Sequence, residues 1–304
     1  MRSREAVPWQ GGDHLFQANR IGCLIIMSLT VFIWVLLAAA CHATWNAIVK
    51  GGADTLLTTV LVAVSAMLMG AVVLPFLAPP AQESWPFIAV STALQIVYYL
   101  LLAKTYQIAD MSQTYPVMRG SAPLIVAGIG VVFLHDAIGL AGWLGIAVIC
   151  LGVLSMALAR ATGKSGNGMR LALCNALVIA SYTLVDGAGV RLSGSPVAYT
   201  LWIFLLTGVP LLVWAVIVRA GQFFRYARKN WMLGAAGGAG TLLSYGVALW
   251  AMTRAPVAMI AALRETSILF GILISALVLK EHVGRQRLLA AAIIALGAGI
   301  LRLA

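Results

Sequence analysis

The chain has 304 residues, of which 62% are hydrophobic and only 10% are charged. This composition excludes an ordinary soluble domain and predicts an integral membrane protein that crosses the lipid bilayer many times. The net charge of +11 does not indicate a nucleic-acid-binding protein, because the basic residues lie singly or in small groups between apolar stretches. We interpret them as loop charges that fix the membrane topology.

The first 23 residues form a polar leader that contains three arginines. No small-residue cleavage site follows the apolar run that begins at Leu24, so a cleaved signal peptide is not expected. Met27 lies just inside this run, which leaves open whether translation starts at Met1 or at Met27. The four cysteines show neither metal-type nor secreted-type spacing, and we interpret them as small buried apolar side chains.

Ten segments are long and apolar enough to form membrane helices, which need about 20 residues each. They lie near 24–49, 55–77, 84–105, 111–133, 138–159, 170–191, 196–219, 231–253, 256–279 and 285–303. We therefore predict an all-α integral membrane protein with ten transmembrane helices. Its expected parts are the leader at 1–23, a first five-helix repeat at 24–160, a polar linker at 161–169 and a second five-helix repeat at 170–304.

Two mid-span arginines and two acids at span ends recur at an interval of 145 residues: Arg119 with Arg264, and Asp136 with Glu281. Around them, residues 118–136 align without a gap over residues 263–281. A looser match at an interval of 137 residues pairs Trp45 with Tyr182. Because five helices per repeat is an odd number, the second repeat must enter the membrane from the opposite side, and the sequence predicts an inverted repeat.

The two mid-span arginines are the main candidates for a binding site. Placing an arginine at the centre of a membrane helix costs about 2.5 to 3.5 kcal/mol, so such a residue usually faces a cavity, a partner or a substrate. A guanidinium can hold a carboxylate, phosphate or phosphonate through two hydrogen bonds. The structural alternative is that Arg264 pairs with Glu265, with Asp186 or with a backbone carbonyl and only locks the helix packing.

Three acids need separate interpretations. Glu265 points about 100° away from Arg264 on a helix, so it is free for another partner. Burial disfavours a charged carboxyl, which makes Glu265 the candidate for exchanging a coupling proton, while a salt bridge to either arginine is the structural alternative. Asp136 and Glu281 precede the next helix of each repeat, and we expect them to face the positive end of its dipole.

Aromatic and polar residues supply the remaining candidates. His42, Trp45 and Asn46 share one face of the first span and predict a cavity wall, although they could equally hold neighbouring helices together. Pro116 predicts a kink close to Arg119. With the tyrosines of the fourth, sixth and eighth spans, the predicted substrate-binding residues are Arg119, Arg264, Glu265, His42, Trp45, Asn46, Tyr115, Tyr182 and Tyr245.

Four motifs carry a resemblance to a known family: HATWNAIVK (42–50), YPVMRGSAPL (115–124), LRETSILFG (263–271) and LVLKEHVG (277–284). They are similar to motifs of the EamA-domain family in the drug/metabolite transporter superfamily, and the likeness extends from Leu24 to Ala304. The resemblance implies two five-helix repeats, secondary transport of small metabolites and no nucleotide-hydrolysing domain.

We therefore predict a secondary transporter, an exporter or exchanger, that moves a small polar metabolite such as an amino acid or another anionic or zwitterionic solute by alternating access. A flippase for a lipid-linked phosphate headgroup is the alternative, because the same arginines would bind its phosphate. The histidines form no metal or catalytic motif, so we expect no enzyme, metal or cofactor. The expected partners are the solute and membrane lipid, with protons as coupling ion and a homodimer left open, in a bacterial inner (plasma) membrane.

Overall fold

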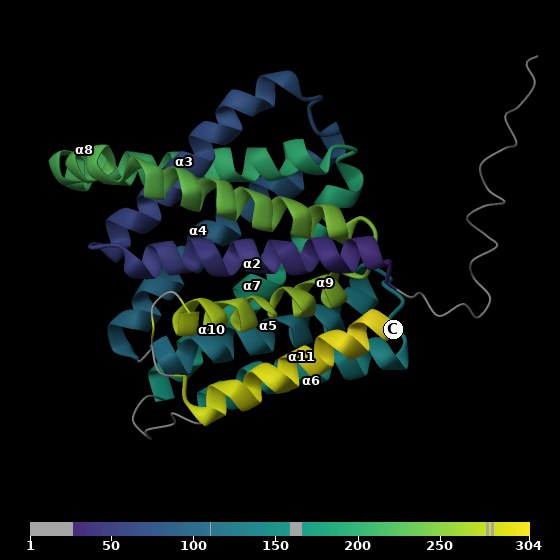
Figure 1. The fold of residues 1–304 in the computed structure, drawn as a ribbon. Coiled ribbons are helices and arrows are strands. Elements are labelled where there is room, and N and C mark those ends of the chain that lie inside the picture. The colour runs from purple at the N-terminus through teal and green to yellow at the C-terminus, as the bar shows by residue number, and fades with distance from the viewer. Residues whose placement is uncertain (1–26, 110, 159–165, 278–279, 281–282) are drawn as a thin grey trace, which may run out of the picture.

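The computed structural model describes residues 27–109, 111–158, 166–277, 280 and 283–304, and its elements are helices packed side by side (Figure 1). The predicted leader, most of the predicted linker and Glu281 lie outside these residues. The helices are α2 (Leu29–Gly51), α3 (Thr55–Val73), α4 (Trp85–Ile108), α5 (Met111–Phe133), α6 (Leu140–Leu158), α7 (Gly166–Leu192), α8 (Pro196–Met252), α9 (Val257–Arg264), α10 (Ser267–Leu277) and α11 (Arg285–Leu303), with short 3₁₀ turns η1 (Leu74–Phe76) and η2 (Gln82–Ser84).

Within the described residues, nine helical segments are long and apolar enough to cross a membrane, with α9 and α10 together forming one of them. Large apolar side chains remain exposed along these helices, including Leu37, Phe133 and Leu296 at 50%, 73% and 62% exposure. Such a surface suits hydrocarbon rather than water. The chain is therefore a multi-pass integral membrane protein.

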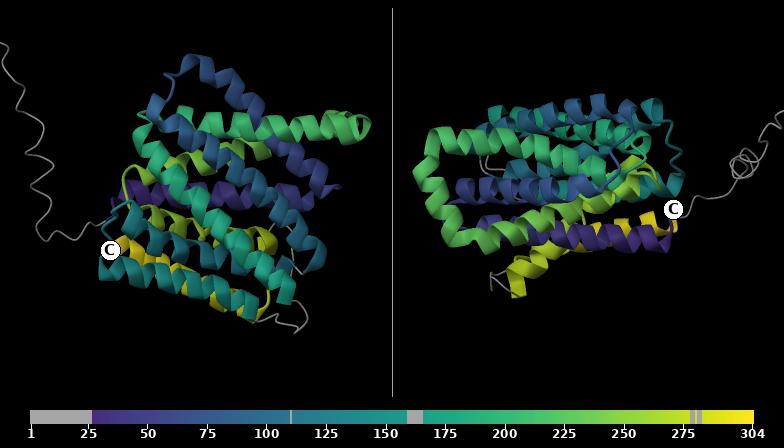
Figure 2. Two further views of the ribbon diagram at one scale, coloured as in Figure 1. Left: turned by 180° about the vertical axis from the view of Figure 1, so that it is seen from behind. Right: turned by 90° about the horizontal axis from the view of Figure 1, so that it is seen from above.

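The difference between nine segments and ten predicted spans lies in α8. A straight helix of 57 residues would be about 85 Å long, far more than the roughly 30 Å hydrocarbon thickness. Its backbone leaves helical geometry at Arg219 and at Asn230, where the chain turns back on itself. Residues 196–218 and 231–252 thus form two arms joined by a bend at one end of the bundle (Figure 2), and these arms match the seventh and eighth predicted spans.

The seam between α6 and α11 shows that the two repeats are related by a two-fold operation. A Cβ atom on Gly152 would lie 2.8 Å from Cγ1 of Ile294, and one on Gly297 would lie 2.7 Å from Cγ1 of Ile149. Both the glycines and the isoleucines are 145 residues apart. Each helix therefore inserts the same side chain against the same glycine of the other, at a distance at which any larger residue would force its neighbours to shift.

The backbone repeats this relation after the fourth and ninth spans. His135 and Lys280, which are again 145 residues apart, both have a left-handed φ of 53°. A non-glycine residue seldom adopts this conformation. The same rare backbone conformation thus follows equivalent helices in both repeats.

The arrangement leaves α5, α9 and α10 in the middle of the bundle. Helices α3 and α8 lie toward one edge and α6 and α11 toward the other, with α2 and α7 on either side of the central group (Figures 1 and 2). The glycine run at 235–240 draws α8 against α3, since a Cβ on Gly237 would lie 2.5 Å from Cγ2 of Val62. The central helices are those that carry the two mid-span arginines.

Candidate functional site

The ninth span is broken at its middle. Helix α9 ends at Arg264 and α10 begins at Ser267. Between them the amides of Glu265 and Thr266 donate to carbonyl oxygens only three residues earlier, at 2.9 and 3.1 Å. This tightened turn interrupts the regular i to i−4 ladder. Broken membrane helices commonly occur at binding sites, because they are tolerated only where protein or a cavity surrounds them.

Arg119 reaches this break from α5 and forms a two-contact ion pair with Glu265. Its Nε donates to Oε2 at 3.1 Å, and its Nη2 lies 2.8 Å from Oε1. The two side chains are 12% and 4% exposed. From the sequence, Glu265 could form a structural salt bridge or bind a substrate or proton. In the structure it forms a salt bridge with the arginine of the other repeat.

Arg264 has a different environment, although it is the repeat equivalent of Arg119. Among the described residues its guanidinium has no carboxylate or hydrogen-bond partner, and it lies over the ring of Tyr245 at 5.1 Å. The interval of 145 explains the difference, because the residue equivalent to Glu265 is Gly120. A Cβ on Gly120 would lie 2.9 Å from Cγ of Leu154, so this position has no room for an acid.

Asp186 bonds to Tyr245, the aromatic platform over whose ring the guanidinium of Arg264 lies. Its carboxylate is fully buried in α7 and accepts hydrogen bonds from the hydroxyls of Tyr245 and Tyr199, the latter at 3.1 Å. Sequence reasoning considered Asp186 as a direct partner of Arg264. In the structure its carboxylate bonds to Tyr245, whose hydroxyl faces the acid while its ring faces the guanidinium.

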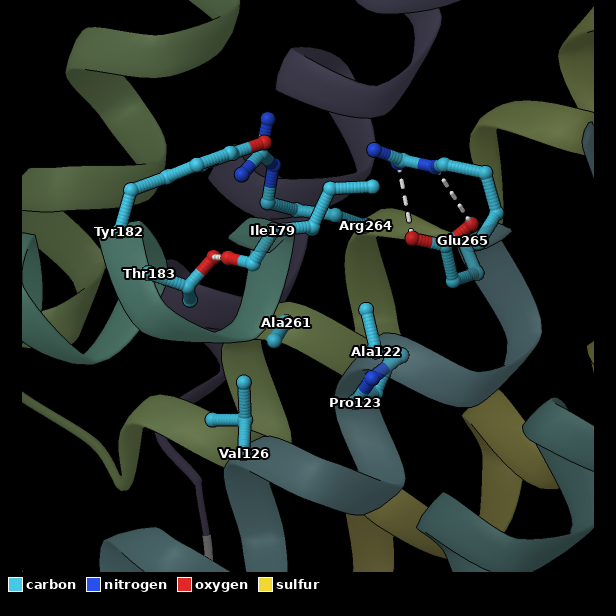
Figure 3. A pocket seen from close by; sticks show the side chains of 10 residues that line it. Ala122, Pro123, Val126, Ile179, Tyr182, Thr183, Ala261, Arg264 and Glu265 are labelled. Carbon is cyan, nitrogen blue, oxygen red and sulfur yellow. Dashed lines mark hydrogen bonds and ion pairs between the residues drawn. The ribbon is translucent and has the colours of Figure 1, made fainter. Parts of the chain in front are cut away.

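These groups meet at a pocket with about 310 Å³ of empty volume. Figure 3 shows Arg264 and Tyr182 on one side of the pocket and Glu265 on the other, with Ala122 and Val126 along an apolar wall. Helices α5, α7 and α9 supply the lining. Two arginines and one carboxylate thus face a small space among apolar side chains, an arrangement that suits a compact charged ligand.

The remaining predicted residues do not all reach this pocket. Trp45 donates from Nε1 to Nδ1 of His42 at 3.3 Å, and Asn46 donates to the carbonyl of His42 at 2.7 Å. The stripe on α2 is therefore bonded within its own helix, and Trp45 lines a second, separate pocket. Tyr115 packs against a buried cluster that includes Met118.

The kink that Pro116 predicts near Arg119 stays a prediction. Pro116 and Pro123 lie inside α5, which runs as one helix from Met111 to Phe133. Because proline has no amide hydrogen, Pro123 leaves the carbonyl of Arg119 without its usual helical donor. The break in the backbone instead occurs in the other repeat, after Arg264.

Asp136 caps a helix, but not the one that follows it. Its Oδ2 accepts from the amide of Val257 at 2.7 Å, at the start of α9, and its Oδ1 lies 2.8 Å from Nη1 of Arg191. Arg191 also donates to the carbonyls of Met252 and Ala255. The expectation that Asp136 meets the dipole of the next helix is wrong, because this contact joins the first repeat to the second.

Within the described residues, His, Cys, Asp and Glu side chains do not gather in threes as a metal site would require.

Comparison with known proteins agrees with this architecture. A family model described as "EamA-like transporter family" matches residues 29–158 and again residues 166–303. No curated protein matches the chain. One similar solved structure, named only "Crystal structure of protein", superposes with a TM-score of 0.74 at 15% identity, over 90% of this chain and 97% of that one. That likeness shows the fold.

Proposed function

Because the chain belongs to the EamA-like transporter family, we propose that it is a secondary transporter of a small anionic or zwitterionic metabolite, such as an amino acid, and that Arg264 binds the anionic group. The family makes it a membrane transporter of small solutes. We also propose that it exports or exchanges this solute by alternating access, and that it lies in a bacterial inner membrane.

The unpaired guanidinium of Arg264 is the observation that carries this proposal. A mid-membrane arginine costs about 2.5 to 3.5 kcal/mol, while its contact with the ring of Tyr245 returns roughly 0.5 to 2 kcal/mol. The buried carboxylates of Asp186 and Glu265 attract it electrostatically, but no carboxylate of the described residues lies within ion-pair distance of its guanidinium. A carboxylate of the substrate would supply that direct contact, through two parallel hydrogen bonds to the guanidinium.

The wall of the pocket favours a solute with one anionic group. In this structure the space open to the centre of a water molecule is about 20 Å³, enough for about one water, so solute binding requires the central helices to move apart. The apolar wall of Ala122, Val126 and Ala261 offers no further charge.

Glu265 is the proposed proton-coupling group. Its carboxylate neutralises Arg119 at 2.8 Å in a site with little exposure. Protonation would remove that negative charge and release Arg119, so the charge that faces the pocket would change by one unit. Replacement of Glu265 by glutamine should then make transport insensitive to an imposed pH gradient while solute exchange persists.

The test is counterflow into proteoliposomes that contain the purified full chain, with labelled amino acids, phosphonates and nucleotide precursors. We expect Arg264→Gln to lower the affinity for the exchanging solute about 10- to 100-fold, because hydrogen bonds to a charged group contribute about 1.5 to 3 kcal/mol. Arg254→Gln is the matched control, since Arg254 lies over Trp250 at 4.8 Å but outside the pocket.

Unchanged exchange by Arg264→Gln would refute the arginine assignment. If no solute exchanges but a labelled lipid phosphate crosses the bilayer, the protein is a headgroup flippase instead.

A further inference from the structure

The short segment at 220–229, which joins the two arms of α8, is rich in basic residues. The backbone leaves helical geometry on either side of it, at Arg219 and at Asn230, and the segment runs across the end of the bundle from one arm to the other (Figure 2). The sequence contains no acidic residue between Asp186 and Glu265. The connection between the arms therefore has positive charge and no negative charge of its own.

One face of this segment is fixed to α3. Phe223 is only 3% exposed and belongs to a buried apolar cluster with Leu57 and Leu61 of α3. Three residues further on, the hydroxyl of Tyr226 lies 2.6 Å from Oγ1 of Thr58. Residues three and four apart lie on the same side of a helix, so Phe223 and Tyr226 hold this side of the segment against the bundle.

The opposite face carries three basic side chains at the same helical spacing, and we call these three residues the basic face. Arg225, Arg228 and Lys229 are exposed, and no carboxylate of the described residues lies within ion-pair distance of them. The nearby Arg219 reaches Asp54 only at 3.9 Å, with both side chains more than a third exposed. The charge of the basic face is thus not neutralised within the described part of the chain.

The length of the arms places the basic face at the membrane surface. The arm at 196–218 is about 35 Å long at 1.5 Å per residue, slightly more than the roughly 30 Å thickness of the hydrocarbon core. Trp231, the first residue of the other arm, is 63% exposed, and Phe224, next to Arg225, is 58% exposed. Exposed aromatic rings are typical of the boundary between lipid tails and headgroups. The basic face therefore lies at the depth of the phospholipid headgroups.

We propose that the basic face binds the phosphate groups of anionic phospholipids, while Phe224 and Trp231 contact their acyl chains. A guanidinium holds a phosphate through two hydrogen bonds, and Arg225 and Arg228 are one helical turn apart, as binding of neighbouring headgroup oxygens requires. The positive-inside rule favours the cytoplasmic side for so basic a connection, and anionic lipids give that leaflet a negative surface potential. This lipid site does not depend on the solute that the protein carries.

A peripheral acidic protein would match the same charge, but the surroundings of the basic face favour lipid. Ile217 and Val218, at the end of the first arm, are 77% and 57% exposed. Acyl chains cover apolar surface of this kind in a bilayer. Phospholipid headgroups therefore already surround the basic face, and their binding requires no further recognition surface.

The experiment measures which phospholipids the purified full chain retains in native mass spectrometry. The protein in detergent is mixed with equal amounts of phosphatidylglycerol, which is anionic, and phosphatidylcholine, which is zwitterionic, with the same acyl chains. We expect the wild-type protein to bind phosphatidylglycerol at least about 30-fold more tightly. Arg225→Gln combined with Arg228→Gln should lower this preference about 10- to 30-fold, because each basic residue near an anionic surface strengthens the attraction about fivefold.

Two further double variants isolate the basic face. Arg285→Gln with Arg287→Gln removes two arginines from the start of α11, at the same end of the bundle, and should keep the preference within about threefold of wild type (Figures 1 and 2). Arg225→Lys with Arg228→Lys keeps the charge and should retain most of the preference, whereas added salt should weaken it. Thermal unfolding without added phospholipid should be the same for all variants, because none of the substituted side chains is buried.

Three results would overturn the inference. Equal retention of the two phospholipids by the wild-type protein would refute the lipid site and leave an acidic protein as the partner of the basic face. An unchanged preference in the Arg225→Gln and Arg228→Gln variant would also refute it. An equal loss after substitution of Arg285 and Arg287 would assign the preference to the whole end of the bundle. None of these results bears on the anion site at Arg264, which counterflow tests separately.

Discussion

The two central arginines occupy equivalent places in the two repeats but meet opposite surroundings. Arg119 stands on the continuous helix α5 and is neutralised by Glu265 at 2.8 Å. Arg264 stands at the end of the broken helix α9, where its guanidinium lies over the ring of Tyr245 and has no ion pair among the described residues. A duplication that copied the charge thus led to one arginine that is held in an ion pair and one that we propose binds the ligand.

A single substitution between the repeats accounts for this asymmetry. Glu265 and Gly120 are equivalent positions, so the second repeat supplies the acid that the first repeat lacks. The acid then crosses to the arginine of the other repeat instead of pairing with its neighbour in sequence. The comparison teaches that internal symmetry can locate a site, while the departure from symmetry indicates which residue binds.

The largest loss of stability should come from removing the carboxylate of Glu265, which pairs with Arg119. Glu265→Gln leaves Arg119 uncompensated in the bilayer, and breaking a buried pair in this way costs about 3 to 5 kcal/mol. Unfolding of the detergent-solubilised protein by heat and denaturant would measure the loss. Glu83→Gln is the control, because Glu83 is exposed in η2. An equal response of the two variants would show that the ion pair does not stabilise the fold.

The next effect tests the part of the molecule where symmetry is kept. Gly152→Ala and Gly297→Ala each place a Cβ within 3.0 Å of an isoleucine across the α6–α11 seam, and overpacking of this kind costs about 1 to 3 kcal/mol. The two losses of unfolding free energy should be nearly equal. Gly299→Ala, whose Cβ would meet no atom within 4 Å, should be neutral or stabilising. Strongly unequal losses at the two glycines would contradict the two-fold seam.

The smallest effect concerns the platform under the unpaired arginine. Tyr245→Phe removes the hydroxyl bonded to Asp186 but keeps the ring, so we expect about 1 to 2 kcal/mol less stability and anion affinity within about threefold of wild type. Tyr245→Leu also removes the ring and should weaken anion binding further. Calorimetric unfolding and ligand titration separate the two effects. If both variants bind anion equally well, the ring does not support Arg264.

Much of the fold follows from the sequence, because hydropathy and charge determine where a chain can cross a membrane. The break at Arg219 and Asn230 separates the same two spans that the charged stretch near 220–230 predicts. The interval of 145 residues likewise located Arg119 and Arg264, which the structure brings to one pocket with Glu265.

The pairing within the site could not be predicted in the same way. Arg264 and Glu265 are neighbours in sequence, yet only the packing of α5 against the broken ninth span determines that Glu265 serves Arg119. The break at Glu265 and Thr266 contains neither proline nor glycine, the residues that signal helix interruption. Pro116 predicts a kink near Arg119, whereas the break between α9 and α10 follows Arg264 in the other repeat.

The most direct test of the asymmetry compares anion binding by two charge-removing variants in nanodiscs, with an amino acid that the wild-type protein exchanges as the probe. Arg119→Gln combined with Glu265→Gln removes the ion pair without leaving either charge alone, and it should bind the probe within about threefold of wild type. Arg264→Gln should lose about 10- to 100-fold in affinity. The reverse order, with binding lost in the double variant and kept in Arg264→Gln, would show that Arg119 is the anion contact and would contradict the account.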